Sequence, residues 1–359
     1  MVFVFFQRIL SIHFAVFFKE LSKNNEVYLF IEEKLSEERK KQGWALPDYG
    51  DTIIKLRHDY SEISDFILTK EKPYYVFSGI HNSNKYKKLF QFAIKNRRRV
   101  GLMSEPYNDL GLKGKLRFYR SWLHYIKYGR YVNFVLGIGN LGFNWYLRTG
   151  YKEEKIFTWA YFTKRKEEME FVEKERGMFN LIFVGQLIER KRILELLEVV
   201  VGLKNTKIKV VGNGRLKEEV IKYQTNYPDK IEYMGVLAND KVLDLVASSD
   251  LLVLPSVFDG WGAIVNESIQ VGTPVICTKN CGASVLLDGQ IRGTSFKWSK
   301  NNLKVELVKW NNKLKVKSER NQIINWSDNI SAKKGVKYFI DVIEYVENIK
   351  GDKPKAPWI

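Results

Sequence analysis

The sequence predicts an α/β protein made of two Rossmann-like domains. Two observations support this prediction. The chain has 359 residues, enough for two domains with separate cores, and short apolar runs alternate with segments of helical period. Because 45% of the residues are apolar and 14% are aromatic, we expect a packed globular protein and not a disordered one.

The second half shows this alternation most clearly. Five short runs, mostly ended by Gly or Pro, are predicted as buried parallel strands: NLIFVG (180–185), KIKVVG (207–212), IEYMG (231–235), DLLVLP (250–255) and TPVICT (273–278). Helix-period segments lie between them, over 192–203, 215–227, 239–249 and 263–272. The order of strand and helix is typical of a doubly wound α/β domain.

The first half alternates less regularly but predicts a second domain of the same class. Its candidate strands are 2–6, 26–31, 52–56, 74–79, 99–104 and 133–139, and its candidate helices are 11–23, 84–96, 115–129 and 141–149. The segment 153–177 begins as a strand and becomes a charged connection. We therefore expect one domain over 1–165, a second over 178–330, and a C-terminal segment, 331–359, whose helix packs back toward the first domain.

The chain carries no clear sign of export. Its apolar N-terminus is interrupted by Arg8 and His13 before it reaches the ~20 residues of a membrane span, and it lacks the pattern of a signal peptide. The two cysteines, Cys277 and Cys281, form no disulfide framework and lack the companions of a metal site, so both are expected to be structural. These features predict a cytoplasmic protein.

The net charge of +18 is concentrated in the first half. Residues 51–150 hold 18 Lys and Arg against 7 Asp and Glu, whereas residues 151–300 hold 22 against 20. A localised positive field suits nucleic acid, anionic lipid or a phosphorylated substrate. The alternative is a lysine-rich composition that serves solubility alone.

One basic run within this half, LKGKLRFYRSWLHYIKYGRYVNF (112–134), has aromatic and leucine residues between its cations. The cations are Lys113, Lys115, Arg117, Arg120, Lys127 and Arg130. As a helix, this pattern predicts a membrane-surface element. The alternative is an ordinary amphipathic helix with one core face, and no nucleic-acid motif accompanies the charge.

The stretch LPSVFDGWGAIVNES places two acids, Asp259 and Glu267, eight positions apart after a predicted strand. Ligands of open parallel sheets bind beyond the carboxyl ends of the strands. Carboxylates accept hydrogen bonds from sugar hydroxyls, and the amides that begin the helix after FDGWG receive phosphate. The stretch therefore suits a sugar nucleotide. Its alternative is a capping Asp259 and a solvated Glu267.

Two further loops follow predicted strands at the same edge. FVGQLIERKR brings Gln186, Arg190, Lys191 and Arg192, and cations at a helix N-terminus oppose the macrodipole unless an anion is bound. VVGNGR adds Gly212, which allows close backbone approach. Together the loops indicate an anionic ligand.

The series FVGQLIERK, VVGNGRLKEE, IEYMG and DLLVLPSVFDGWGAIVNESIQVGTPVI resembles the nucleotide-binding half of the family 4 glycosyltransferases. The resemblance covers residues 180–290 and extends faintly to 137–157 and 104–111. It implies the GT-B fold, in which two Rossmann-like domains face each other across a cleft.

By position, the resemblance implies that Glu267 binds the ribose hydroxyls and that Asp259, where the family usually has the longer glutamate, faces the donor sugar. Lys191 resembles the diphosphate-binding lysine. Gln186 stands where many members have arginine, a charge that Arg190 is expected to replace. The resemblance implies further donor-binding residues: Val236 beside the base, and Gly212, Gly260, Trp261, Gly262 and Ala263 along the donor.

The resemblance also implies an activity: retaining transfer of a hexosyl unit from a UDP- or GDP-linked sugar, without a metal or other cofactor. We expect a lipid-linked saccharide acceptor in the assembly of a bacterial surface polysaccharide or glycolipid, and a peripheral location on the inner face of the cell membrane. Glu105 is the candidate catalytic group on the acceptor side, beside Asp259 and Lys191 on the donor side; His81 and His124 are weaker candidates. Two rival readings are a GT-B-fold nucleotide-sugar epimerase and a basic nucleic-acid-binding protein.

Overall fold

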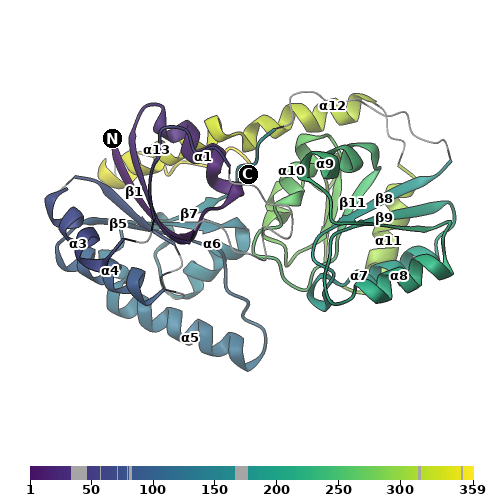
Figure 1. Cartoon of the computed structure of the whole chain (residues 1–359), viewed down its shortest axis with the longest axis horizontal. Helices are drawn as coiled ribbons and strands as arrows, with labels where there is room; N and C mark the ends of the chain where they lie inside the picture. Colours follow the sequence, from purple (N-terminus) through teal and green to yellow (C-terminus); the bar gives the residue numbers. More distant parts are fainter. Residues whose placement is uncertain are drawn as a thin grey trace. The chain divides into compact units, whose positions relative to one another are not determined.

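The computed structural model describes residues 1–33, 47–56, 58–70, 72–78, 80, 83–165, 177–313, 317–348 and 351–359. The chain divides into two compact units (Figure 1). The described part of the first unit runs from the N-terminus to Thr163 and resumes with Ile330–Ile359, and the second unit is Lys164–Asn329. Each unit has its own parallel sheet, so the prediction of two α/β domains is confirmed.

The sheet of the first unit has seven strands within the described residues, in the order β3-β2-β1-β4-β5-β6-β7. The strands are β1 (Val2–Ile9), β2 (Glu26–Glu33), β3 (Ile53–Leu56), β4 (Tyr74–Phe77), β5 (Arg99–Ser104), β6 (Phe134–Ile138) and β7 (Ile156–Trp159). All neighbouring pairs are parallel. Their carboxyl ends therefore lie at one edge of the sheet. Glu105, the residue directly after β5, lies at this edge.

Helices cover both faces of this sheet, because successive residues of β1 point to opposite sides. Val4 and Phe6 belong to the core beneath α3 and α4, whereas Phe5 packs against Phe18 of α1 and Phe339 of α13. The helices of the unit are α1 (Ile12–Ser22), α3 (Tyr60–Thr69), α4 (Asn84–Lys95), α5 (Gly111–Tyr128), α6 (Gly139–Arg148) and α13 (Ala332–Asn348).

Helix α3 is not among the helices predicted from the sequence, although its start carries a recognisable signal. The backbone N–H of Asp59 donates to the Glu62 side chain at 3.2 Å, as in a capping box. The DYSE sequence at 59–62 fits that motif.

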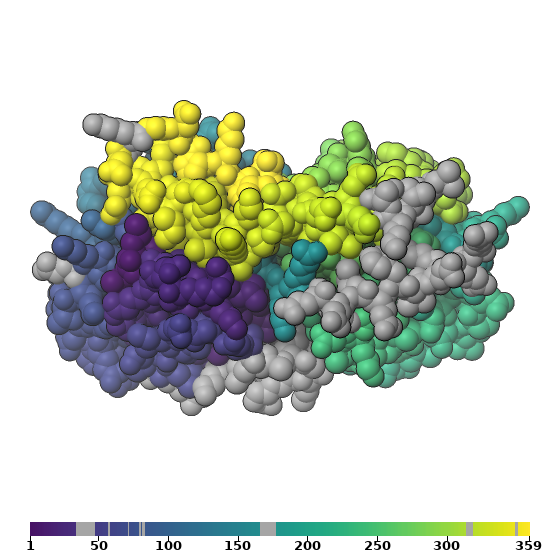
Figure 2. All heavy atoms as spheres, turned by 90° about the horizontal axis from the view of Figure 1, so that it is seen from above, coloured from purple at the N-terminus to yellow at the C-terminus, as the bar shows by residue number. Residues whose placement is uncertain are grey.

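The C-terminal segment belongs to the first unit and completes its core. Figures 1 and 2 both show α13, in yellow, beside the purple N-terminal residues. Phe339 of this helix has its ring centroid 5.0 Å from that of Phe3. Farther along, Trp358 is buried against Phe162 and Tyr338. The segment thus covers a face of the sheet that the first 163 residues leave open.

The sheet of the second unit has the order β10-β9-β8-β11-β12-β13 within the described residues and is also parallel. Its strands are β8 (Phe179–Val184), β9 (Thr206–Val211), β10 (Ile231–Gly235), β11 (Leu251–Leu254), β12 (Val275–Thr278) and β13 (Gly293–Phe296). The first five strands agree with the sequence-based prediction. The short GTSF of β13 was not predicted, because two of its four residues are small and polar.

The helices of the second unit are α7 (Ile193–Val201), α8 (Lys217–Asn226), α9 (Asn239–Ser248), α10 (Ile264–Gln270), α11 (Lys300–Asn311) and α12 (Lys317–Trp326). Leu196, Val220 and Leu307 join α7, α8 and α11 to one core cluster with β8 and β9. Helices α9 and α10 lie on the opposite face of the sheet (Figure 1). This two-sided cover explains why the strands are apolar runs and do not alternate.

Candidate donor site at the carboxyl edge of the second sheet

The loops after β8, β9 and β10 are joined by backbone hydrogen bonds. The N–H of Gly185 donates to the Val211 carbonyl at 3.0 Å, and the N–H of Gly212 donates to the Gly235 carbonyl at 2.8 Å. Gly212 has φ +136°, and a Cβ there would lie 1.9 Å from the carbonyl oxygen of Gly185. Gly212 is therefore needed for the close approach of its loop to the loop that contains Gly185. The sequence predicts a close backbone approach at Gly212, and in the structure the approaching group is the protein's own backbone.

These loops place Gln186 and Val236 at one edge of the sheet. Both residues are exposed, Val236 to 43%. Their exposure leaves the edge accessible to a ligand.

The basic residues after β8 contact the loop after β11. Lys191, in the short 3-10 helix Glu189–Lys191, forms an ion pair with Asp259, and the two side chains are only 12% and 14% exposed. Arg190 donates from Nη1 to the Phe258 carbonyl at 2.6 Å. Lys191 and Arg190, whose charges oppose a helix macrodipole at its N-terminus, thus have a carboxylate and a carbonyl partner within the protein.

Arg192 makes a comparable contact that the sequence analysis did not anticipate. Its Nη1 donates to the Pro255 carbonyl at 3.3 Å, and its guanidinium lies 4.1 Å from the ring centroid of Trp298. Arg192 adopts a left-handed backbone with φ 54°, which begins α7 at the next residue. Its role is to join the two loops.

Asp259 does not cap the helix that follows it. The N-cap position of α10 is Ala263, with no side-chain cap hydrogen bond. The backbone of Asp259 instead pairs with the chain after β12: its N–H donates to the Asn280 carbonyl at 2.9 Å, and its carbonyl accepts from Gly282 N–H at 3.0 Å. The alternative reading of Asp259 as a cap is therefore wrong.

Glu267 is a buried residue of α10. It is only 8% exposed, and burial raises the pKa of its carboxyl to about 7. The alternative reading of a solvated surface glutamate is therefore wrong. A carboxyl that is costly to ionise, in the helix that follows the loop after β11, is a candidate for ligand binding.

Buried side chains stabilise the DGWG turn. Trp261 is 1% exposed, and its Nε1–H donates to Oδ1 of Asn266 at 2.7 Å. The Sγ of Cys281 lies 2.9 Å from the Trp261 carbonyl, and a Cβ on Gly262, whose φ is +89°, would lie 2.8 Å from that sulfur. Of the four predicted lining residues, Gly260 and Trp261 are buried and Gly262 and Ala263 are partly exposed, so Gly262 and Ala263 are the ones that a ligand can reach.

In the first unit, Glu105 lies exposed directly after β5 and accepts a hydrogen bond from the hydroxyl of Tyr161. His124 packs on α5 between Phe90 and Tyr128, with ring centroids 5.2 and 5.0 Å away, which favours a structural role. His81 lies outside the described residues.

Helix α5 packs against the rest of the first unit on one side. Its buried residues are Gly114 and Ser121, and Tyr125 and Tyr128 are partly buried against the core of the unit. The opposite face exposes apolar side chains at heptad spacing, namely Leu112, Leu116, Tyr119, Leu123 and Ile126, with Trp122 beside them, each 40–80% exposed. Of the predicted basic residues, Lys113, Lys115, Arg120, Lys127 and Arg130 are exposed and Arg117 is partly exposed. The alternative of an amphipathic helix with one core face holds for the side on which Tyr125 and Tyr128 pack against the core of the unit. The exposed apolar row on the other side is the feature that this alternative does not explain.

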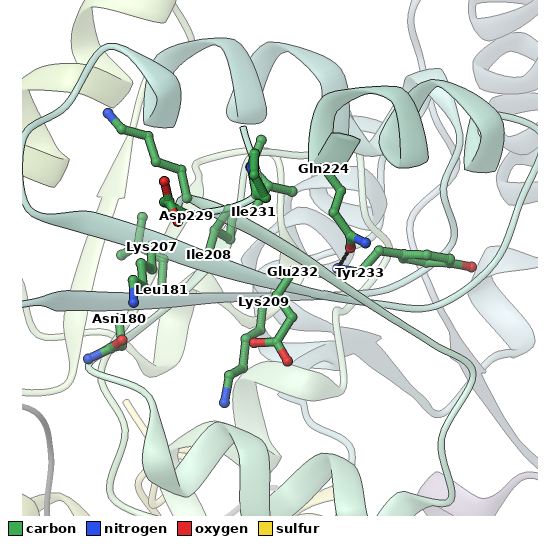
Figure 3. A pocket seen from close by; sticks show the side chains of 12 residues that line it. Asn180, Leu181, Lys207, Ile208, Lys209, Gln224, Asp229, Ile231, Glu232 and Tyr233 are labelled. Carbon is green, nitrogen blue, oxygen red and sulfur yellow. Dashed lines mark hydrogen bonds between the residues drawn. The ribbon is translucent and has the colours of Figure 1, made fainter. Parts of the chain in front are cut away.

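A pocket of about 360 Å³ lies elsewhere in the second unit (Figure 3). Its lining includes Asn180, Lys207 and Ile231, which stand near the starts of β8, β9 and β10. This is the amino edge of a parallel sheet, opposite to the loops that carry Lys191 and Asp259. Since ligands of such sheets bind at the carboxyl edge, we do not assign the donor to this pocket.

The two parallel α/β units have the fold of the GT-B glycosyltransferases. The lipopolysaccharide outer core galactosyltransferase WaaB, solved in its apo form, matches with a TM-score of 0.69 over 96% of this chain and 99% of its own, at 13% identity. HepE of Anabaena, solved in complex with UDP, matches with a TM-score of 0.64 over 97% of this chain and 98% of its own, at 11% identity. At such identities the likeness establishes the fold.

Residues 164–307 match the family described as glycosyl transferases group 1. This match lies within the second unit, Lys164–Asn329. The putative teichuronic acid biosynthesis glycosyltransferase TuaC of Bacillus subtilis is 34% identical over 106 residues, 29% of this chain and 26% of that protein. An uncharacterized glycosyltransferase of Methanocaldococcus jannaschii is 27% identical over 118 residues, 32% of this chain and 30% of that protein. The matched part is thus less than a third of either curated relative.

Proposed function

We propose that this protein is a retaining glycosyltransferase that moves a hexosyl unit from a UDP- or GDP-linked donor to a saccharide acceptor. The observation that supports this most directly is the Lys191–Asp259 ion pair, followed in the chain by the buried Glu267, at the carboxyl edge of the second sheet. This edge lies within the segment that matches the group 1 glycosyl transferases. A cation and two carboxylates suit a ligand that has a diphosphate and several hydroxyls.

We assign Lys191 to the donor diphosphate. Its side chain is held at the sheet edge by Asp259, which limits the rotamer freedom of a long lysine. An ammonium has three N–H donors, so Lys191 can bind Asp259 and a phosphate oxygen together. In this proposal its charge stabilises the negative charge that builds on the leaving diphosphate, without a divalent metal.

We assign Asp259 and Glu267 to hydroxyl groups of the donor, Asp259 on the sugar side and Glu267 on the ribose side. Both carboxyls are mostly shielded from water, which strengthens a hydrogen bond to a hydroxyl relative to one in bulk solvent. Arg190 is assigned a supporting role, because its guanidinium holds the Phe258 carbonyl next to Asp259.

We further propose that α5 binds an anionic membrane surface and brings the enzyme to a lipid-linked acceptor. The exposed apolar row Leu112, Leu116, Tyr119, Leu123 and Ile126 has basic residues around it. Apolar side chains bury in the headgroup region while cations contact anionic lipids. Among the described residues, no helix is long and apolar enough to cross a membrane.

The acceptor belongs, in this proposal, to the assembly of a bacterial surface polysaccharide or glycolipid. One curated relative supports that choice by its description: TuaC is described as a putative teichuronic acid biosynthesis glycosyltransferase.

The proposal is tested by incubating the protein with a panel of UDP- and GDP-sugars, a lipid extract as acceptor source and EDTA, and measuring transferred sugar by mass spectrometry. We expect transfer in the wild type and a loss of at least 100-fold in Lys191→Ala and Glu267→Ala, with Lys207→Ala as a control for an exposed lysine at the opposite sheet edge. Unchanged transfer in Lys191→Ala and Glu267→Ala would refute the assignment. Donor conversion without any acceptor would favour an epimerase instead.

A further inference from the structure

Tyr161 forms a hydrogen bond with Glu105. It is not among the site residues predicted from the sequence. Glu105 follows β5 and Tyr161 follows β7, two strands that are separated only by β6 in the sheet. The Tyr161 hydroxyl donates to Oε1 of Glu105. Two loops that are 56 positions apart in sequence therefore present one hydrogen-bonded pair at the carboxyl edge of the first sheet.

Tyr161 is itself held in place by α1. Its ring stacks on that of His13, with centroids 5.2 Å apart and planes 8° from parallel, and meets Phe14 edge to face at 4.8 Å. The backbone supports the same arrangement, since Phe162 N–H donates to the His13 carbonyl at 3.0 Å and Phe162 is fully buried. The ring position is thus set by packing and leaves the hydroxyl to contact Glu105.

Glu105 gains its orientation from this contact. An exposed glutamate has several rotamers of similar free energy, and fixing one of them costs conformational entropy. Its backbone is also restrained, because the Ser104 hydroxyl donates to the Glu105 carbonyl at 2.9 Å. The rigidly held Tyr161 hydroxyl restricts the Glu105 carboxylate before substrate binds. Less conformational entropy is then lost when the acceptor binds.

We propose that Tyr161 is a positioning residue that orients the Glu105 carboxylate toward the acceptor hydroxyl. This inference rests on the proposed function and on the sequence-based expectation that Glu105 is the catalytic group on the acceptor side. In this inference Tyr161 acts through Glu105.

The test compares Tyr161→Phe, which keeps the ring on His13 and removes only the hydroxyl, with Tyr60→Phe, a control on an exposed tyrosine of the same unit. Steady-state kinetics are measured at a temperature at which the circular dichroism of each variant matches the wild type. We expect kcat to fall about tenfold in Tyr161→Phe, the size expected for one hydrogen bond to a charged group. The KM for the donor and the activity of Tyr60→Phe should remain as in the wild type.

A double-mutant cycle with Glu105→Gln separates positioning from an independent role. If Tyr161 acts through Glu105, adding Tyr161→Phe to Glu105→Gln causes no further loss. Losses that multiply, or a Tyr161→Phe variant as active as wild type while Glu105→Gln is impaired, would overturn the inference and leave the proposed function standing. Wild-type activity in Glu105→Gln, with Lys191→Ala inactive, would remove the acceptor-side role of Glu105 and the inference with it.

Discussion

At the scale of single residues, we expect the buried carboxyl of Glu267 to determine how the proposed donor site responds to pH. Burial raises its pKa to about 7, because a charged carboxylate loses its hydration inside the protein. A donor hydroxyl that hydrogen-bonds to the carboxylate favours the ionised form. Donor binding and the loss of this proton are therefore linked.

We predict that donor affinity increases with pH until Glu267 is ionised in the empty site. With a pKa of about 7, affinity should be about tenfold lower at pH 6 than at pH 8 and nearly constant above pH 8. Isothermal titration calorimetry with a nucleotide sugar that binds the wild type measures this directly. Glu267→Gln should bind more weakly and show little of this pH dependence; an equally steep dependence in Glu267→Gln would contradict the role of this carboxyl.

The same group should affect stability in the absence of donor. Because the folded protein holds the Glu267 proton more tightly than the unfolded chain, its contribution favours folding below about pH 4.5 and is lost as the pH rises to about 7. The loss amounts to about 3 kcal/mol at pH 8 for a shift of this size. Urea unfolding should find Glu267→Gln more stable than wild type at pH 8 but not at pH 5. Glu232→Gln, a change at an exposed glutamate, serves as the control and should show no such difference.

At the scale of secondary-structure elements, the strand-end loops of the second unit form one connected layer. Gly185, Gly212 and Gly235 link the loops after β8, β9 and β10 through backbone hydrogen bonds, and the Lys191–Asp259 pair connects the first of them to the loop after β11. The positions of Lys191 and Asp259 thus depend on backbone geometry several residues away.

Gly212→Ala should disrupt this layer. The new Cβ would lie 1.9 Å from the Gly185 carbonyl oxygen, at a φ of +136° that side chains rarely adopt, so we expect a loss of at least 2 kcal/mol in unfolding free energy and weaker donor binding. Gly289→Ala is the matched control, because Gly289 also has positive φ but no atom within 4 Å of the added Cβ. It should lose only about 1 kcal/mol; equal losses in both variants would show that loop contact is unimportant.

Helix α5 is the element that we propose to bind an anionic membrane surface. Flotation with liposomes that contain anionic lipid should recover the wild-type protein, and Leu116→Asp combined with Leu123→Asp should reduce recovery by at least tenfold, because both the apolar contact and the positive field are weakened. Leu68→Asp, on an exposed leucine of α3, makes the same chemical change on another helix and should float as the wild type does. Flotation of the α5 double variant at the wild-type level would contradict the membrane role.

At the scale of the whole molecule, the sequence predicted most strands and which loops follow their carboxyl ends in the second unit, because apolar runs and strand-end loops are local signals. It did not predict that Lys191 and Asp259 form an ion pair, or that Trp261 lies in the interior with Asn266 as its partner. Those contacts join positions distant in sequence or depend on how a turn folds. Tyr161 was missed for the same reason, since its link to Glu105 exists only once β5 and β7 are in one sheet.

The C-terminal segment is predicted from the sequence only in its helical part. The helix expected within 331–359 is α13, and it belongs to the first unit, where Phe339 packs on Phe3 and Phe5. The following residues, up to the buried Trp358, had no periodic signal. Their packing against Phe162 and Tyr338 depends on aromatic side chains that meet only in the folded unit.

The central claim is that a nucleotide sugar binds at the carboxyl edge of the second sheet, and it is tested most directly by a crystal structure of the protein soaked with UDP- and GDP-sugars. We predict density in which the diphosphate contacts Lys191, ribose hydroxyls contact Glu267, and the base lies near Val236. Density for the nucleotide at the amino-edge pocket beside Lys207, with the Lys191–Asp259 edge left without ligand, would contradict the account.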